Sequence, residues 1–374
     1  MSWSFKLVRV FGIEIRLHAL FGLLVLWQAI VAYTTTGTAG GVLSSVGFIG
    51  VLFFVIVLHE LGHALTARQF GIRTVDITLL PIGGLARLER MPEKPWQELL
   101  VALAGPAVNV VLAAALALAH LAAGMPLVPT DPALPFVTSL LYANVALAAF
   151  NLLPAFPMDG GRVLRAALAL RGDPVRATRV AARVGQALAL LLGIVGLFSN
   201  TMLVVIALFV WFGAAAELAS VELKAALRGL PVEWAMLKAC DPLSPSDTLD
   251  TAAKLTIAHG HRDFPVVDAE GRVVGALTGR KLVEGLATMG ATARVAQVMD
   301  TRIEVADVAR PIEEALAKLE ASPAGILVVL GEGRVQGLIS RETIQQLALF
   351  READDFARRH VARPRTTTLT PSAA

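Results

Sequence analysis

Long stretches without a charged side chain constrain this protein more than any other feature of its sequence. No Asp, Glu, Lys or Arg occurs between Arg16 and Glu60, and similar gaps cover residues 99–130, 132–158 and 184–216. Each gap is long enough to cross a bilayer, which takes about 20 apolar residues in a helix. Because 55% of the residues are hydrophobic, the chain is predicted to be a membrane protein rather than a soluble one.

We expect about six membrane-spanning helices. The last uncharged stretch, 184–216, would be about 50 Å long as one helix, whereas the hydrocarbon core is about 30 Å thick. It is therefore divided at Ser199-Asn200-Thr201 into two helices joined by a tight turn. The predicted spans lie near 17–36, 43–66, 97–124, 134–153, 176–198 and 201–222.

Lys and Arg fall on one side of this arrangement. They precede the first span, follow the second, fourth and sixth spans, and are absent from the loops at the opposite ends. By the positive-inside rule, a multi-pass protein of the plasma membrane is expected, with both termini in the cytoplasm. The net charge of +3 is small and membrane orientation explains the basic residues, so nucleic acid is not expected as a partner.

The loop from Phe70 to Arg90, after the second span, alternates apolar and polar residues on both sides of a Pro and Gly turn at 81–84. Such alternation is typical of β-strands, and a short turn between two alternating runs is typical of a hairpin. The loop is therefore predicted to form a β-hairpin at the membrane surface.

The second apolar run contains the sequence His59-Glu60-Leu61-Gly62-His63. On a helix, His59 and His63 lie one turn apart on the same face, where both can bind one metal ion. The pattern also arises by chance. In a membrane helix, however, a charged side chain costs about 2.5 to 3.5 kcal/mol at the bilayer centre, which favours a functional reason for its presence. Glu60 is placed to take a proton from water at the metal.

A third ligand must come from another segment, because a hydrolytic zinc site usually has three protein ligands and one water. Asp159 is the leading candidate. It follows Pro154 and Pro157, which interrupt the fourth span, and two glycines come directly after it. A broken helix can turn a side chain inward where the backbone lines a wet cavity. The alternative is that Asp159 caps a helix over 160–170.

Together these residues resemble a known family. His59-Glu60-x-x-His63 and Asn151-x-x-Pro154-x-x-Pro157-x-Asp159-Gly160 are similar to the paired motifs of the site-2 proteases, which use zinc to cleave transmembrane segments of other proteins. The resemblance covers about residues 10–225. The segment from Gly105 to Asn109 looks like a further family segment, with Asn109 as a weaker polar candidate.

The resemblance implies a role for each matching residue. One zinc ion per chain would be bound by His59, His63 and Asp159. Glu60 would be general base and acid, and Asn151 would hold the substrate carbonyl or its oxyanion. The implied activity is regulated intramembrane proteolysis of membrane-protein substrates that carry a transmembrane helix, in contact with the lipid bilayer. The alternatives are a transporter or channel regulated by its soluble part, or an inactive membrane scaffold.

The last third of the chain contains a weak internal repeat. Residues 264–286 and 326–348 share the order strand, acidic-Gly turn, strand and helix. This resembles a tandem pair of cystathionine-β-synthase (CBS) domains, at about 232–290 and 293–350. The predicted fold class is therefore a polytopic α-helical membrane protein, 1–228, followed by a soluble α/β tandem CBS module, 229–350.

CBS pairs often bind adenosine nucleotides, but the usual carboxylate that holds the ribose is missing here. Thr278 is followed three residues later by Lys281, and Ser340 by Thr343, instead of Asp. The pair is expected in the cytoplasm, either as a nucleotide sensor that regulates the protease or as a structural or homodimerisation module. The polar tail, 351–374, is predicted to be disordered.

Overall fold

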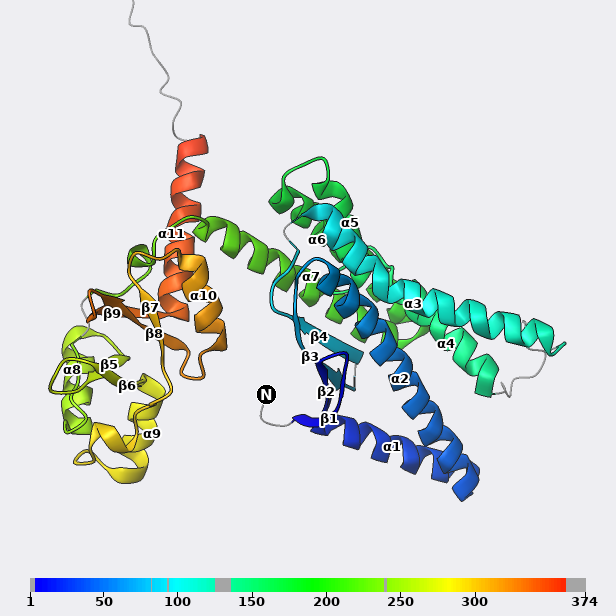
Figure 1. Ribbon diagram of the computed structural model, residues 1–374, viewed down its shortest axis with the longest axis horizontal. Helices are drawn as coiled ribbons and strands as arrows, with labels where there is room; N and C mark the ends of the chain where they lie inside the picture. Colours follow the sequence, from blue (N-terminus) through cyan, green and yellow to red (C-terminus); the bar gives the residue numbers. More distant parts are fainter. Residues whose placement is uncertain (1–3, 82, 93, 125–135, 239–240, 361–374) are drawn as a thin grey trace, which may run out of the picture. The chain divides into compact units, whose positions relative to one another are not determined.

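Apolar helices make up most of residues 4–219 (Figure 1). The computed structural model describes residues 4–81, 83–92, 94–124, 136–238 and 241–360. Within these ranges five helices are long and apolar enough to cross a bilayer: α1 (Ala19–Thr36), α2 (Ala39–Gln69), α3 (Pro95–Ala122), α6 (Pro174–Ser199) and α7 (Thr201–Leu227). A shorter apolar helix, α4 (Phe136–Asn151), corresponds to the fourth predicted span. The expectation of about six spans is confirmed in outline.

The breaks between helices fall where the sequence predicts them. Gly37 ends α1 in the left-handed region at φ 64°, and its N–H donates to the carbonyl of Tyr33. Thr38 begins α2, since its hydroxyl accepts from the N–H of Gly41 at 3.1 Å. Asn200 alone separates α6 from α7, and its side chain accepts from the N–H of Met202 at 2.9 Å. Side-chain and left-handed caps thus end helices that apolar composition alone would continue.

A four-stranded sheet in the order β1-β2-β3-β4 packs on α2. The hairpin predicted after the second span is confirmed as the antiparallel pair β3 (Thr74–Leu80) and β4 (Gly83–Leu88). The antiparallel pair β1 (Ser4–Val10) and β2 (Ile13–His18) was not predicted, although its alternating residues carry the period of a strand. One face of the sheet buries Ile13, Ile15, Ile77 and Leu79 against Phe53, Val57 and Leu61 of α2.

One buried carboxylate ties three of these strands together. Asp76 of β3 is 1% exposed and accepts hydrogen bonds from both the Nε and the Nη2 of Arg87 in β4. On the other side, Nε of Arg16 in β2 lies 3.7 Å from Asp76 Oδ2. The hydrogen bond and charge of Arg87 hold the pKa of Asp76 below its usual range.

The second compact unit, Ser220–Ala374, contains the two predicted repeats. The first comprises α8 (Leu249–His259), β5 (Phe264–Val267), β6 (Val273–Leu277) and α9 (Gly279–Met289); the second comprises β7 (Glu304–Asp307), α10 (Ile312–Ala321), β8 (Ile326–Gly331), β9 (Arg334–Ser340) and α11 (Arg341–His360). Short 3₁₀ helices cover Val232–Trp234 and Val295–Gln297. Each repeat has its own apolar core.

The soluble part differs from expectation in two places. Strand β7, which pairs in parallel with β8, was not predicted from its short sequence. Helix α11 continues to His360, beyond the start predicted for the disordered tail, and residues 361–374 lie outside the described residues. The two compact units meet at residues 219 and 220, within α7, and the predicted domain boundary at 228 and 229 stays a prediction.

The ion pairs of Asp76 predict how the stability of this sheet depends on pH. A lowered pKa means that the stabilisation is present above the unfolded value of about 3.9 and is lost as the pH falls through the folded pKa. Asp76→Asn should therefore destabilise the detergent-solubilised protein at pH 7, by on the order of 1–3 kcal/mol, and matter less below about pH 4.

Thermal melts of the two proteins at pH 7 and pH 3 test this expectation. Lys6→Gln is the control, because the ion pair of Lys6 with Glu14 is exposed and exposed pairs contribute little. Equal melting temperatures for wild type and Asp76→Asn at pH 7 would contradict it.

Candidate metal centre

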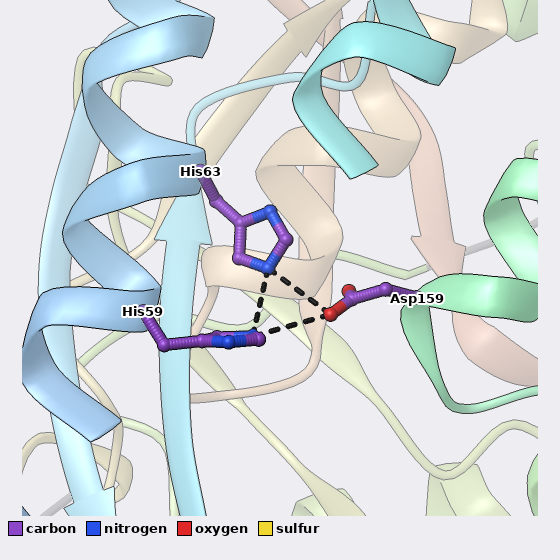
Figure 2. A group of neighbouring side chains, drawn as sticks. All are labelled: His59, His63 and Asp159. Atoms are coloured by element: carbon purple, nitrogen blue, oxygen red, sulfur yellow. Dashed lines mark hydrogen bonds and ion pairs between the residues drawn. The ribbon is translucent and has the colours of Figure 1, made fainter. Parts of the chain in front are cut away.

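Three buried side chains from two distant segments converge on one point (Figure 2). His59 and His63 project from the same side of α2, and Asp159 faces them from the start of α5 (Asp159–Ala169). The Nε2 atoms of the two histidines lie 3.1 Å apart, and Asp159 Oδ2 lies 3.2 Å from each. Ligands at about 2.0–2.1 Å from a tetrahedral zinc ion lie about 3.3 Å from one another. The three atoms therefore fit the first shell of one ion.

Contacts on the far side of each imidazole support this interpretation. His63 Nδ1 lies 2.7 Å from the carbonyl oxygen of Val101, which can only accept, so this nitrogen donates. His59 Nδ1 lies 2.5 Å from Asn109 Oδ1. With both Nδ1 atoms donating, two Nε2 lone pairs and a carboxylate oxygen face one another. Such a set repels itself unless a cation lies between its members, and metal-binding histidines have this second hydrogen bond almost without exception.

A glycine of α3 lies directly against the imidazoles of this donor set. A Cβ at Gly105 would lie 2.7 Å from His59 Nε2 and would overlap His63 Nε2. Gly62 of α2 is equally tight, since a Cβ there would lie 2.7 Å from the carbonyl oxygen of Ala104. Small residues let two membrane helices approach to backbone contact. The segment from Gly105 to Asn109 thus contributes a glycine under the imidazoles and an amide behind one of them.

Two further glycines turn Asp159 toward α2. A Cβ at Gly160 would overlap the backbone of Leu152 and Leu153, and one at Gly161 would lie 2.6 Å from Phe156 N. The start of α5 can therefore pack directly on the loop that precedes it. Asp159 is the first residue of α5, and the N-cap is Met158. The capping alternative for Asp159 is wrong, because its carboxylate faces the histidines instead.

A buried ion cluster anchors α5. Arg165 Nε donates to Glu98 Oε1 of α3 at 2.7 Å, and its Nη1 donates to Glu217 Oε1 of α7 at 2.5 Å. The same guanidinium lies over the ring of Phe156, 5.3 Å from its centroid. Because α5 is short, these polar contacts hold the helix that carries Asp159 against two long helices and its own loop.

The remaining predicted site residues line one cavity of about 500 Å³ together with the donor set. Glu60 reaches toward strand β4, where Glu60 Oε2 accepts from the N–H of Ala86 at 3.1 Å. Asn151, the last residue of α4, lines the same cavity, as does Arg162, which the sequence did not single out. The structure thus brings all five predicted residues together, and their chemical roles stay predictions.

The sequence analysis also missed Asn144 and Val101, which support the two histidines. Asn109 Nδ2 donates to Asn144 Oδ1 at 3.2 Å, and both residues are fully buried. An asparagine inside an apolar span could have indicated Asn144, because polar groups there require partners. Val101 contributes only its backbone carbonyl, for which a sequence carries no signal.

The fold and the buried donor set define a multi-pass membrane protein with a site suited to zinc. The model of Peptidase family M50 matches residues 47–128 and 124–192, and the CBS domain model matches residues 235–288 and 295–348. The chain is 31% identical over 345 residues to a zinc metalloprotease of Methanocaldococcus jannaschii, covering 92% of this chain and 96% of the relative.

The chain is also similar to two further proteins. Rip3, a candidate zinc metalloprotease of Mycobacterium tuberculosis, is 30% identical over 93% of both chains. The solved site-2 protease from M. jannaschii is 35% identical, with 57% of this chain and 95% of that chain covered and a TM-score of 0.43. The chain belongs to Peptidase family M50, the site-2 protease family of membrane metalloproteases, and carries a tandem pair of CBS domains. This family assignment contradicts the transporter and channel alternatives.

The packing under the imidazoles predicts that Gly105→Ala weakens metal binding without changing a ligand. The added methyl group must displace one or both histidines, and disturbed support of metal ligands typically costs 10- to 100-fold in affinity. We expect a loss in that range, measured as zinc retained against a competing chelator.

Gly193→Ala in α6 is the matched control, because a Cβ there makes only an ordinary 3.5 Å contact with Ala207. Equal zinc affinity for the two variants would show that Gly105 does not support the site.

Proposed function

We propose that this protein is an intramembrane zinc metalloprotease, which hydrolyses peptide bonds within or near transmembrane segments of membrane-protein substrates. The proposal is supported by the convergence of the buried side chains of His59, His63 and Asp159 on a cavity that Glu60 and Asn151 also line. His59, His63 and Asp159 hold one zinc ion. The family assignment supports zinc and proteolysis, and the apolar helices around the cavity support a substrate that lies in the membrane.

Each residue then has a defined task. Bound zinc lowers the pKa of water toward about 7 and polarises a carbonyl group. Glu60 accepts the proton of the attacking water and passes it to the leaving amine. The hydrogen bond from the N–H of Ala86 keeps the Glu60 carboxylate in place between these two steps. The Asn151 amide donates to the substrate oxygen as negative charge develops on it.

The position of the motif along α2 supports access from the cytoplasm. Helix α2 begins at Ala39, and His59 lies about 30 Å further along at 1.5 Å per residue. This distance equals the thickness of the hydrocarbon core. The cavity then lies near the membrane face opposite the α1–α2 turn. Lys and Arg gather at the face that is close to the cavity. We infer that this face is the cytoplasmic side of the plasma membrane, and that both termini and the CBS pair lie there.

The cavity lining indicates the kind of substrate. Most of its side chains are apolar, among them Leu52, Phe53, Ile56, Leu147, Phe150 and Phe209. An apolar lining suits the apolar sequence of a transmembrane segment. A peptide bond within an intact helix is covered and hydrogen-bonded, so the segment must unwind locally before Glu60 and Asn151 can reach it. Substrates should therefore contain residues that weaken a helix near the cleaved bond.

Substitution of the proposed base separates catalysis from metal binding. Glu60→Gln should retain zinc and lose cleavage of a membrane substrate by on the order of 10²- to 10⁴-fold, the usual contribution of a general base. Asp159→Asn should lose zinc as well. Zinc content and cleavage in detergent or liposomes measure the two effects separately.

Undiminished proteolysis by Glu60→Gln would refute the assignment. A proteomic comparison of membranes that contain wild type or Glu60→Gln would identify proteins that accumulate uncleaved, and hence the substrates.

For the CBS pair we propose regulation of the protease by an adenosine nucleotide. A cleft between the repeats is lined by Thr278 and Ser340 together with charged side chains, including Arg262 and Asp263. Burial raises the pKa of Asp263, which accepts from the N–H of Gly279. The Thr278 hydroxyl already caps α9. Homodimerisation therefore stays the alternative role of the pair.

Titration of the full-length protein with ATP or AMP tests the sensor role. A nucleotide at 100 times its Kd stabilises the folded state by about 2.7 kcal/mol, so the melting temperature should rise and the cleavage rate should change. If neither quantity moves and no heat of binding is measured, the sensor proposal fails and dimerisation remains.

A further inference from the structure

Two buried amides connect His59 to the backbone of α4. His59 Nδ1 lies 2.5 Å from Asn109 Oδ1, Asn109 Nδ2 lies 3.2 Å from Asn144 Oδ1, and Asn144 Nδ2 lies 2.9 Å from the carbonyl oxygen of Leu140. Both asparagines are 0% exposed. We call Asn109, Asn144 and the Leu140 carbonyl the amide relay. It crosses from α4 through α3 to α2.

The far end of the amide relay determines its direction. The Leu140 carbonyl can only accept a hydrogen bond, so Asn144 must present its NH₂ group to it. Asn144 Oδ1 is then left to face Asn109, which must donate its own NH₂ group. Asn109 Oδ1 therefore faces His59, and His59 Nδ1 must hold the proton. The lone pair of His59 Nε2 is consequently directed toward His63 and Asp159.

The two candidate ligands are therefore supported differently. His63 Nδ1 donates directly to the carbonyl of Val101, an acceptor that cannot exchange roles. His59 donates to an amide, and a rotated amide would present NH₂ instead. The proton of His59 would then move to Nε2, where it points into the donor set and opposes a cation. A buried amide whose oxygen is turned toward a carbonyl oxygen leaves polar groups without hydrogen bonds. Each such group costs about 1–3 kcal/mol of stability.

We propose that Asn144 is a positioning residue, which fixes the tautomer of His59 through Asn109 and so prepares the site for its metal ion. The inference rests on the proposed function, because it takes His59 Nε2 as a zinc ligand. Asn144 does not line the cavity and acts only through Asn109.

Two substitutions of Asn144 separate positioning from a merely structural role. Asn144→Leu removes both hydrogen bonds and frees the Asn109 amide to rotate. Asn144→Asp still accepts from Asn109 and so keeps its orientation, but places a carboxyl group in a buried site. Positioning predicts weaker zinc binding in the Leu variant, by about tenfold or more, and near wild-type binding in the Asp variant. A merely structural role predicts that zinc affinity falls in proportion to melting temperature. The Asp variant should then be the more impaired of the two, because it buries a charge.

Thr138→Val is the matched control. Thr138 of α4 bonds His120 of α3 at 2.9 Å, and both residues are buried, so this pair also joins α3 to α4 without contact to His59. Its loss should lower the melting temperature and leave zinc affinity unchanged.

A substitution of Asn109 should restore the zinc affinity that Asn144→Leu loses. Asn109→Asp presents only acceptor oxygens to His59 when it is ionised, whatever occupies position 144. Asn109→Asp combined with Asn144→Leu should therefore regain zinc affinity relative to Asn144→Leu alone. If Asn144→Leu does not fold, the smaller Asn144→Ala, which removes the same two hydrogen bonds, takes its place in both comparisons.

Competition with a chromophoric chelator and thermal melts of the full-length protein give both readouts without an activity assay. Equal zinc affinity for Asn144→Leu and Thr138→Val, or absence of rescue, would overturn the role of Asn144. Absence of zinc binding by the wild type would overturn the metal site itself, and the inference with it.

Discussion

The structure of the membrane part depends on satisfying polar groups inside an apolar helix bundle. His59 and His63 lie on a helix that is otherwise apolar, and each ring has a hydrogen-bond acceptor on one nitrogen and the carboxylate of Asp159 near the other. Because unpaired polar groups are costly in such surroundings, these contacts constrain how α2, α3 and α5 pack. The packing of the helices and the positions of the donor atoms therefore depend on each other.

Glycine and arginine residues contribute to this packing in different ways. Gly105 lets the backbone of α3 reach the imidazoles, and Gly160 lets α5 begin directly on its preceding loop. Arg165 then ties α5 to Glu98 and Glu217 of the neighbouring helices. Removal of one partner from a buried ion pair usually costs about 3–5 kcal/mol. The position of Asp159 thus depends on residues outside the donor set.

Much of this arrangement can be predicted from the sequence. The rest depends on contacts between residues that are far apart in the chain. The uncharged stretches, the His59 pair and the broken helix before Asp159 are local patterns, and each predicted the correct element or neighbourhood. The capping role considered for Asp159 failed because a local pattern does not show which way a side chain turns. Asn144 and Arg165 were not identified, since their partners lie on other helices and neither belongs to a motif. The strands β1 and β2 carry a period-two signal, but it is short and lies directly before the stronger apolar signal of the first span.

We propose that two imidazoles and one carboxylate, drawn from α2 and α5, bind one zinc ion. X-ray absorption at the zinc edge of the purified full-length protein tests it most directly. The structure predicts one zinc ion per chain with only nitrogen and oxygen ligands, at about 2.0–2.1 Å, two of them imidazoles. Sulfur scattering at about 2.3 Å, or a spectrum unchanged by Asp159→Asn, would contradict this coordination.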